Sequence, residues 1–230
     1  MQLFSFTVAG GNASFFDPLE EACAAQIEFV KLEYPGHGFR RKEKLCDTFQ
    51  ELSIDLYGQI KEHYSGGEYA VLGYSMGSIA VLETLRVLTE RNELPYPCHV
   101  FLAAHEPKKI VDLEKCNQAE LDEYVKNRTI LFGGLPEQLV GNKLFWRVYL
   151  PLYKADYFMI SRYNFDQAAY ISDIPATVFY SEEDTPRAEM EHWKRYFVGC
   201  CEFVEYTGSH FFINEHCKEM AILIKERLGV

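Results

Sequence analysis

Apolar segments alternate with amphipathic segments along most of the chain. Short runs of apolar residues predict strands at residues 3–8, 27–33, 69–73, 99–103, 176–180 and 202–206. Helices are expected at residues 48–64, 79–88, 189–197 and 215–228. The helical period is clearest in the first of these, where apolar residues recur every three or four positions: Phe49, Leu52, Leu56 and Ile60. Such alternation is typical of a mostly parallel sheet with helices on both faces.

The alternation is interrupted between Cys116 and Asn164. This stretch is predicted to be helical, is rich in aromatic residues, and is divided by the turn Gly133-Gly134-Leu135-Pro136. It is far longer than an ordinary connection between a strand and a helix. We therefore expect a core formed by residues 1–115 and 165–230, with residues 116–164 inserted as a helical lid over the sheet. The alternative is an ordinary pair of crossover helices.

The pentapeptide Gly73-Tyr74-Ser75-Met76-Gly77 lies between an expected strand and an expected helix. A G-x-S-x-G sequence in this setting is typical of a nucleophile elbow. The sharp turn lifts the Ser75 hydroxyl off the sheet edge, and the glycines allow the neighbouring backbones to approach. The alternative is a glycine-rich turn with an inert serine, which does not explain the strand before it or the helix after it.

A serine hydroxyl becomes a nucleophile when a base removes its proton, and in this kind of fold the acid and the histidine follow the serine in that order. His210 lies between the last strand and the last helix and is the predicted base, with His216 as the alternative. The acid is expected in the loop after residues 176–180, where we predict Asp184. The alternative acids are Glu182, Glu183 and Asp173.

Two backbone N–H groups are needed to bind the oxyanion that forms when the serine attacks. One is expected from Met76, and the other from the small residues of the loop Thr7-Val8-Ala9-Gly10-Gly11. A phosphate-binding loop is disfavoured there, because neither G-x-G-x-x-G nor a P-loop lysine is present.

Composition narrows the class of protein. The 230 residues carry 23 basic and 34 acidic side chains, a net charge of −11, which argues against nucleic-acid binding. Seven scattered cysteines without a C-x-x-C pair indicate reduced thiols. The first residues lack the features of a signal peptide, and no apolar stretch approaches the roughly 20 residues that span a membrane. We expect a cytoplasmic protein without a membrane or metal site.

Six segments together resemble the type II thioesterases of nonribosomal peptide and polyketide synthesis. The segments are Phe6-Thr7-Val8-Ala9-Gly10-Gly11-Asn12-Ala13-Ser14, Tyr34-Pro35-Gly36-His37-Gly38-Phe39-Arg40, the elbow, Gly133-Gly134-Leu135-Pro136-Glu137, Leu150-Pro151-Leu152-Tyr153-Lys154-Ala155-Asp156-Tyr157 and Gly208-Ser209-His210-Phe211-Phe212. The corresponding family patterns are F-P-x-A-G-G-x-A-S, L-P-G-R-G-x-R, G-H-S-M-G, L-G-G-x-P-E, L-P-x-L-R-A-D-F and G-G-H-F-F. Thr7 stands where the family has proline, Tyr74 where it has histidine, and Thr185-Pro186-Arg187 departs from the pattern after the acid.

This resemblance implies an α/β-hydrolase fold and hydrolysis of acyl groups from the phosphopantetheine arm of carrier proteins, with no cofactor of the enzyme's own. It implies Ser75 as nucleophile, Asp184 as acid and His210 as base, with the oxyanion bound by the amides of Met76 and Ala9. The residues expected to contact the substrate are Val8, Tyr74, Phe132, Trp146 and Phe211.

Carrier domains are the expected partners of a monomeric enzyme. The basic run containing Arg40, Arg41, Lys42 and Lys44 is either part of their docking surface or a solvated loop. Two other functions remain open from the sequence. One is hydrolysis of small esters or lipids by the same fold, and the other is a non-catalytic binding protein built on it.

Overall fold

The centre of the molecule is a sheet of six parallel strands. The computed structural model describes residues 1–23, 26–109, 112–168 and 170–230. The strands are β1 (Gln2–Phe6), β2 (Glu28–Lys31), β3 (Tyr69–Tyr74), β4 (His99–Ala103), β5 (Ala176–Tyr180) and β6 (Cys201–Glu205). Their order across the sheet is β2-β1-β3-β4-β5-β6. Because all are parallel, the loops that follow them meet at one edge of the sheet.

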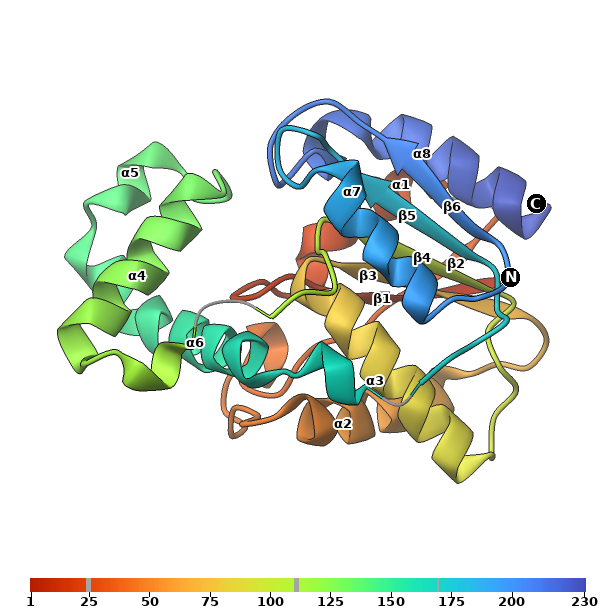
Figure 1. Cartoon of the computed structure of the whole chain (residues 1–230), viewed down its shortest axis with the longest axis horizontal. Coiled ribbons are helices and arrows are strands. Elements are labelled where there is room, and N and C mark those ends of the chain that lie inside the picture. Colours follow the sequence, from red (N-terminus) through yellow and green to blue (C-terminus); the bar gives the residue numbers. More distant parts are fainter. Residues whose placement is uncertain (24–25, 110–111, 169) are drawn as a thin grey trace.

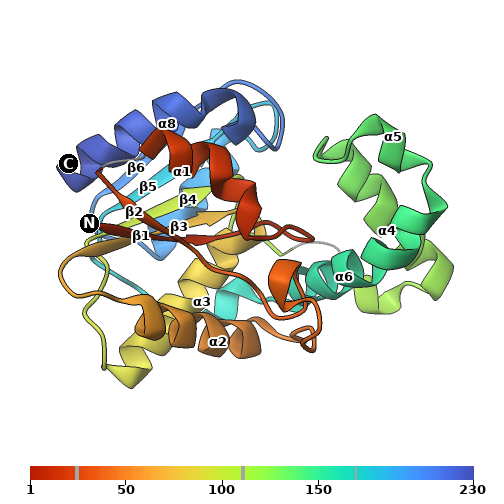
Figure 2. The ribbon, with the colours of Figure 1, turned by 180° about the vertical axis from the view of Figure 1, so that it is seen from behind.

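Helices cover both faces of this sheet (Figure 1). Helices α1 (Asp17–Cys23) and α8 (Ile213–Leu228) pack together on one face, and α2 (Phe49–His63) and α3 (Met76–Arg91) pack together on the other. The view from behind shows the same layers (Figure 2). The predicted parallel sheet with helices on both faces is therefore confirmed.

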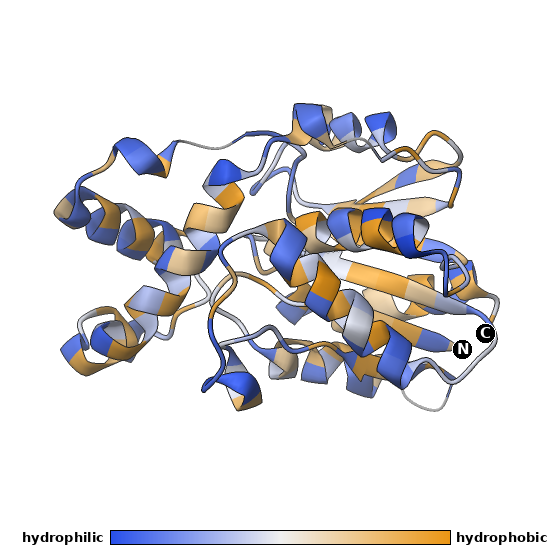
Figure 3. Cartoon of the chain, turned by 90° about the horizontal axis from the view of Figure 1, so that it is seen from below, coloured by the Kyte–Doolittle hydropathy of each residue, from blue (hydrophilic) through white to orange (hydrophobic). Residues whose placement is uncertain are grey.

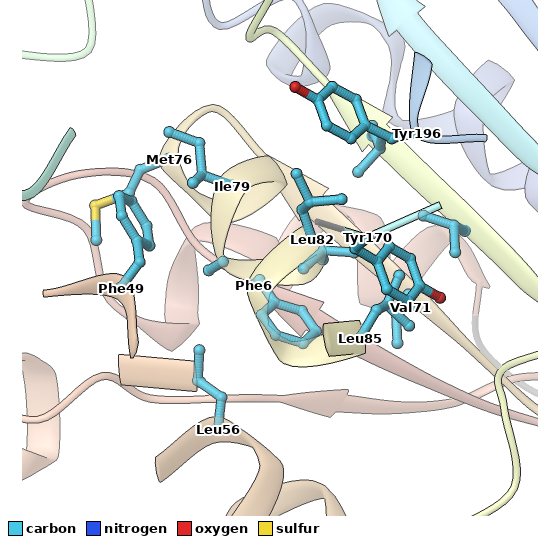
Figure 4. Close-up of a cluster of buried hydrophobic side chains, with 14 of the residues drawn as sticks. Phe6, Phe49, Leu56, Val71, Met76, Ile79, Leu82, Leu85, Tyr170 and Tyr196 are labelled. Atoms are coloured by element: carbon cyan, nitrogen blue, oxygen red, sulfur yellow. The ribbon is translucent and has the colours of Figure 1, made fainter. Parts of the chain in front are cut away.

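The four inner strands are buried because each side of the sheet faces a hydrophobic core, while the edge strands β2 and β6 are mostly half-buried. Figure 3 shows apolar residues along the strands, while the helices carry both apolar and polar residues. In the core on the α2–α3 side, Phe6 and Val71 lie among side chains of both helices (Figure 4). Met76 belongs to this cluster and its side chain is fully buried, so the first turn of α3 is anchored directly in the core.

Residues 116–164 are largely helical, as predicted. They contain α4 (Gln118–Leu131), α5 (Glu137–Val140) and α6 (Lys143–Arg162). Helix α4 begins with a capping box, in which Asn117 and Glu120 bond each other's backbone N–H groups. Helices α4 and α5 extend away from the sheet, and α6 leads the chain back toward it (Figure 1).

Several boundaries differ from the predictions: β1 ends two residues earlier than expected, and α3 extends three residues further at each end. The strand expected at residues 27–33 is shorter, and the single helix expected at 189–197 is replaced by α7 (Arg187–Met190) followed by a 3₁₀ helix at Glu191–Arg195. The other 3₁₀ helices are Ala13–Phe16, Gly38–Arg40, Leu113–Lys115 and Phe165–Gln167. Among the described residues, no helix is long and apolar enough to cross a membrane.

Candidate active site

Ser75 occupies a strained turn between β3 and α3. Its backbone has a φ of 54° and a ψ of −119°, and its N–H donates to the carbonyl of Ala103 at 2.8 Å. A Cβ on Gly73 would lie 2.4 Å from the Gly77 carbonyl oxygen, and a Cβ on Gly77 would lie 2.0 Å from that of Phe6. Both positions therefore require glycine, which explains the spacing that the sequence shows on either side of Ser75.

His210 and Asp184 complete a hydrogen-bonded chain with Ser75. The Nε2 atom of His210 lies 2.9 Å from the Ser75 hydroxyl oxygen. Its Nδ1 atom lies 2.9 and 3.0 Å from the two carboxylate oxygens of Asp184. An ionised carboxylate only accepts hydrogen bonds, so it favours the tautomer with the proton on Nδ1. Nε2 is then free to accept the hydroxyl proton.

The alternative acids are engaged elsewhere. Glu183 accepts from the backbone N–H of Gly208 at 2.9 Å, and Glu182 accepts from that of Arg187 at 3.0 Å. Asp173 precedes β5, at the opposite end of the strand from the loop that holds Asp184. The alternative base, His216, lies with its Nε2 3.1 Å from the carbonyl oxygen of Thr207. The structure therefore places Asp184 and His210, and not these alternatives, in the chain that includes Ser75.

Two backbone N–H groups next to Ser75 lack a partner within the described residues. They belong to Met76, which opens α3, and to Ala9, in the loop after β1. The first N–H groups of a helix have no acceptor inside the helix, so that of Met76 is available to a ligand. Strands β1 and β3 are neighbours, with Phe6 opposite Gly73, and their loops therefore meet beside Ser75. This is the arrangement that an oxyanion hole needs.

The loop that carries Ala9 is held by several hydrogen bonds. The Thr7 hydroxyl donates to the Asn12 carbonyl at 3.1 Å, and the Tyr34 hydroxyl donates to the Thr7 carbonyl at 2.8 Å. The Gly11 N–H donates to the Val8 carbonyl at 3.1 Å. Thr7, which replaces the family's proline, thus closes the loop through its side chain.

Two adjoining cavities flank Ser75 and the loop Thr7-Val8-Ala9-Gly10-Gly11, here called the oxyanion loop because it carries the predicted donor Ala9. The first, of about 320 Å³, is lined by Ser75, Ala9, His105 and His210 from the core and by Phe132 and Tyr157 from the helical insertion. The second, of about 280 Å³, is lined by Ala9, Gly10, Phe211, Phe132, Tyr153 and Tyr157. Both cavities share Val8, Ala9, Phe132, Tyr157 and Phe211. The insertion therefore forms one wall of each cavity.

The residues expected to contact substrate separate into two groups. Val8, Phe132 and Phe211 line the cavities. Tyr74 does not: it is fully buried, and its hydroxyl donates to the carbonyl of His210 at 2.8 Å. Trp146 also lies outside both linings, with its indole N–H bonded to the Val140 carbonyl. Tyr74 was expected to contact the substrate, but it is the last residue of β3 and its side chain packs into the core with Phe212 and Ile213.

Phe132 brings the helical insertion into contact with the predicted base. Its ring stacks on the imidazole of His210 with centroids 3.9 Å apart and an angle of 22° between the planes. The guanidinium of Arg128, one turn earlier, lies 4.3 Å from the centroid of the same ring. The sequence does not predict this stack of Arg128, Phe132 and His210, because 78 positions separate Phe132 from His210.

Sequence reasoning missed His105, which lies in the loop after β4 and lines the first cavity. It is buried, and burial lowers the pKa of its imidazole. A neutral imidazole therefore faces the cavity. Its position after a strand at the carboxyl edge of the sheet is the signal that could have identified it.

The basic run near Gly38 is partly neutralised. Arg40 binds the carboxylates of Asp55 and Glu43 and also donates to the Glu33 carbonyl. Arg40 thus holds local structure, whereas Arg41 and Lys42 are exposed.

Across the described residues, no group of three side chains is arranged to hold a metal ion.

The six-stranded parallel sheet, the strained serine turn and the order of serine, acid and histidine define a serine hydrolase of the α/β-hydrolase fold. Residues 1–228 match the family model for the thioesterase domain. The chain belongs to this family and is a thioester hydrolase.

Individual relatives narrow the resemblance. The chain is 24% identical over 224 residues to thioesterase PikA5 of Streptomyces venezuelae, a match that covers 96% of this chain and 79% of that protein. It is 25% identical to the medium-chain S-acyl fatty acid synthase thioesterase of Homo sapiens, over 96% and 84% of the two chains. The solved structure of ClbQ from the colibactin NRPS/PKS pathway superposes with a TM-score of 0.86 at 25% identity, covering 99% and 96%. The resemblance to type II thioesterases is confirmed.

Proposed function

We propose that this protein removes acyl or aminoacyl groups from the phosphopantetheine arms of carrier domains in nonribosomal peptide or polyketide synthesis. Its role there is editing, the clearance of misloaded or stalled intermediates. The observation that carries the proposal is the hydrogen-bonded chain from Asp184 through His210 to Ser75, beside two backbone N–H groups that have no partner among the described residues. This arrangement is suited to acyl transfer, because it supplies a nucleophile, a base and donors for a developing oxyanion.

In the first half of the reaction the Ser75 oxygen attacks the thioester carbonyl carbon while Nε2 of His210 takes the hydroxyl proton. The carbonyl oxygen becomes an oxyanion, which the N–H groups of Met76 and Ala9 stabilise. The C–S bond then breaks, and His210 returns its proton to the departing sulfur. The arm leaves as a free thiol and the acyl group remains on Ser75 as an ester.

In the second half a water molecule takes the place of the thiol. His210 removes a proton from the water as the oxygen attacks the acyl carbon, and the same amides hold the second oxyanion. When the C–O bond to Ser75 breaks, His210 protonates the serine oxygen. The products are a carboxylic acid and the original enzyme.

The paired cavities support a substrate that extends on both sides of the reacting bond. A carrier-bound thioester has an acyl group on one side of the carbonyl and a long, thin arm on the other. The two cavities adjoin at Ala9 and Phe132, so each can take one of these parts. The likeness to ClbQ, a protein of the colibactin NRPS/PKS pathway, also supports a carrier-bound substrate.

Mass spectrometry of the intact protein tests this proposal. With an acyl-carrier protein as substrate, we expect the wild type to release free acid and to be labelled once by a serine-directed phosphonate. Ser75→Ala is expected to keep its fold, lose labelling, and lose turnover by several orders of magnitude. Near-normal turnover by Ser75→Ala would contradict the proposed role of this residue.

A comparison of substrates tests the carrier. The kcat/KM value for the acyl-carrier protein is expected to exceed that for the matching acyl cysteamine, because the carrier and its arm add contacts that the small thioester lacks. Equal kcat/KM values for the two substrates would contradict recognition of the carrier and would indicate a hydrolase of free thioesters.

A further inference from the structure

A buried acidic residue of the helical insertion contacts the oxyanion loop directly. Asp156, in α6, is 1% exposed, and its Oδ2 atom accepts a hydrogen bond of 2.6 Å from the backbone N–H of Gly10. Gly10 follows Ala9, whose own N–H is one of the two predicted oxyanion donors. Asp156 lies 146 positions from Gly10 in the sequence, so only the fold brings the two together. The mechanism proposed above gives Asp156 no role.

The Asp156 carboxylate is held in turn by His37. The Nε2 atom of His37 lies 2.9 Å from the same Oδ2 atom, and its Nδ1 atom lies 2.9 Å from the carbonyl oxygen of Pro35. Both neighbours accept hydrogen bonds, and only an imidazolium has two N–H groups to donate. His37 is 2% exposed. The geometry therefore indicates a buried ion pair.

The pKa of His37 agrees with this protonation state. Burial alone lowers the pKa of the imidazole, but the Asp156 carboxylate and the Pro35 carbonyl outweigh it and hold the pKa above its ordinary value. Three of the segments that resemble the thioesterase family meet at this pair: the loop with Gly10, the turn with His37, and the α6 segment with Asp156. The turn with His37 and the α6 segment with Asp156 contribute no residue to the hydrogen-bonded chain of Asp184, His210 and Ser75.

Packing around Gly10 leaves the loop little freedom. Its φ is 68°, in the region that favours glycine, and a Cβ there would lie 1.9 Å from the ring of Tyr153, one turn before Asp156. Helix α6 thus contacts the loop twice, through a ring against the Gly10 backbone and through a carboxylate that accepts its N–H. A shift of the carboxylate would move the peptide that joins Ala9 to Gly10.

We propose that Asp156, oriented by His37, positions the oxyanion loop so that the Ala9 N–H stays aligned with the thioester carbonyl. The pair are positioning residues, because neither touches the reacting atoms. This inference rests on the proposed function, since it assigns the Ala9 amide to the oxyanion. It also couples the helical insertion to catalysis, because the same helix lines the cavities and holds the loop.

The role predicts a particular kinetic pattern. Misalignment of an oxyanion donor weakens binding of the transition state more than binding of the substrate. Asp156→Asn, which keeps the shape but loses the charge, is expected to lower kcat by at least about tenfold while KM changes less than about threefold, given that loss of a whole donor costs roughly 10²–10³-fold. Affinity for a trifluoromethyl ketone, which forms a tetrahedral oxyanion adduct, should fall in parallel with kcat.

Glu83→Gln is the matched control. Glu83 is also a buried carboxylate, 3% exposed, and it accepts from the Tyr163 hydroxyl and pairs with Arg86. It lines neither of the two cavities beside Ser75 and the oxyanion loop. Its loss is expected to lower stability without changing kcat. If Asp156→Asn lowers only the unfolding free energy, as this control does, Asp156 has a purely structural role and the proposal is overturned.

A second variant, His37→Gln, tests the same pair from its other side, so the proposal is still tested if Asp156→Asn does not fold. It keeps the carboxylate that accepts the Gly10 N–H, and the glutamine N–H₂ group can still donate to that carboxylate, so the same kinetic pattern is expected at smaller size. The Gly10 amide proton is also followed by NMR in ¹⁵N-labelled protein. In the wild type it should exchange slowly with solvent, and in His37→Gln its resonance should shift upfield. An unchanged amide and unchanged kcat in that variant would overturn the proposal.

The proposed function is tested separately by the same assay. Hydrolysis of an acyl cysteamine by the wild type and its loss in Ser75→Ala establish the reaction before the positioning variants are measured. If that step fails, the proposed function fails. If it holds and the positioning variants keep kcat and inhibitor affinity, only the role of Asp156 and His37 is rejected.

Discussion

Replacing Asp184 by asparagine is a direct test of how the predicted base is oriented. Both carboxylate oxygens of Asp184 lie within 3.0 Å of Nδ1 of His210, so one of them accepts its proton whichever way the carboxylate turns. The amide has one acceptor and one N–H₂ donor in the same space. With the donor facing Nδ1, the imidazole proton moves to Nε2, which then cannot accept the Ser75 proton.

The expected loss is large, because the charge is also removed. Even with its oxygen facing Nδ1, the neutral amide cannot balance the imidazolium that forms during attack. Removal of the carboxylate charge in comparable triads lowers kcat about 10⁴-fold, or about 5 kcal/mol in the barrier. We expect a loss of this order for Asp184→Asn, with little change in KM.

The assay is steady-state hydrolysis of an acyl cysteamine, with thermal unfolding measured in parallel to show that the variant is folded. Glu182→Gln is the control, since this exposed side chain makes a single hydrogen bond within the described residues, accepting from the Arg187 backbone N–H. Its kcat is expected to stay within about twofold of the wild type. A folded Asp184→Asn with kcat within tenfold of the wild type, or an inactive Glu182→Gln, would refute the assignment of the acid.

Two further predictions concern the elbow and the helical insertion. Gly77→Ala is expected to lower the unfolding free energy by about 3 kcal/mol or more, because its Cβ would meet the Phe6 carbonyl, whereas Gly141→Ala, with open space around it, should change it by less than about 1 kcal/mol in urea titrations. Equal effects would contradict the packing argument. Residues 116–164 are expected to act as a lid, with amide exchange faster than in β3 and β4 and slower once an acyl phosphonate occupies Ser75. Uniformly slow exchange, unchanged by the phosphonate, would instead indicate a rigid part of the core.

Local patterns in the sequence were enough to predict most of the sheet. The strands at 99–103 and 176–180 were predicted to the residue, because a buried parallel strand is a short, uninterrupted apolar run. The helix at 189–197 was wrong in detail, because its apolar positions do not show where α geometry gives way to the tighter 3₁₀ turn. Helical periodicity is too coarse to separate the two over a few residues.

Ser75 and the order of its expected partners could be read from the sequence, since the elbow is a local structure whose glycines are required by contacts within a few residues or between neighbouring strands. The choice of Asp184 over Glu183 could not be made with the same force. Both lie in one acidic turn, and only the folded loop directs Asp184 to His210 and Glu183 to the Gly208 N–H.

The tertiary structure alone decided which distant residues meet around Ser75. Tyr74 adjoins the nucleophile in sequence but is buried behind it, whereas Phe132, far away in the chain, stacks on His210. Asp156 reaches the Gly10 amide across 146 positions. Periodicity reports which face of an element is apolar, but the contacts of a polar group buried between two elements depend on how those elements pack, and that is decided by the whole core at once.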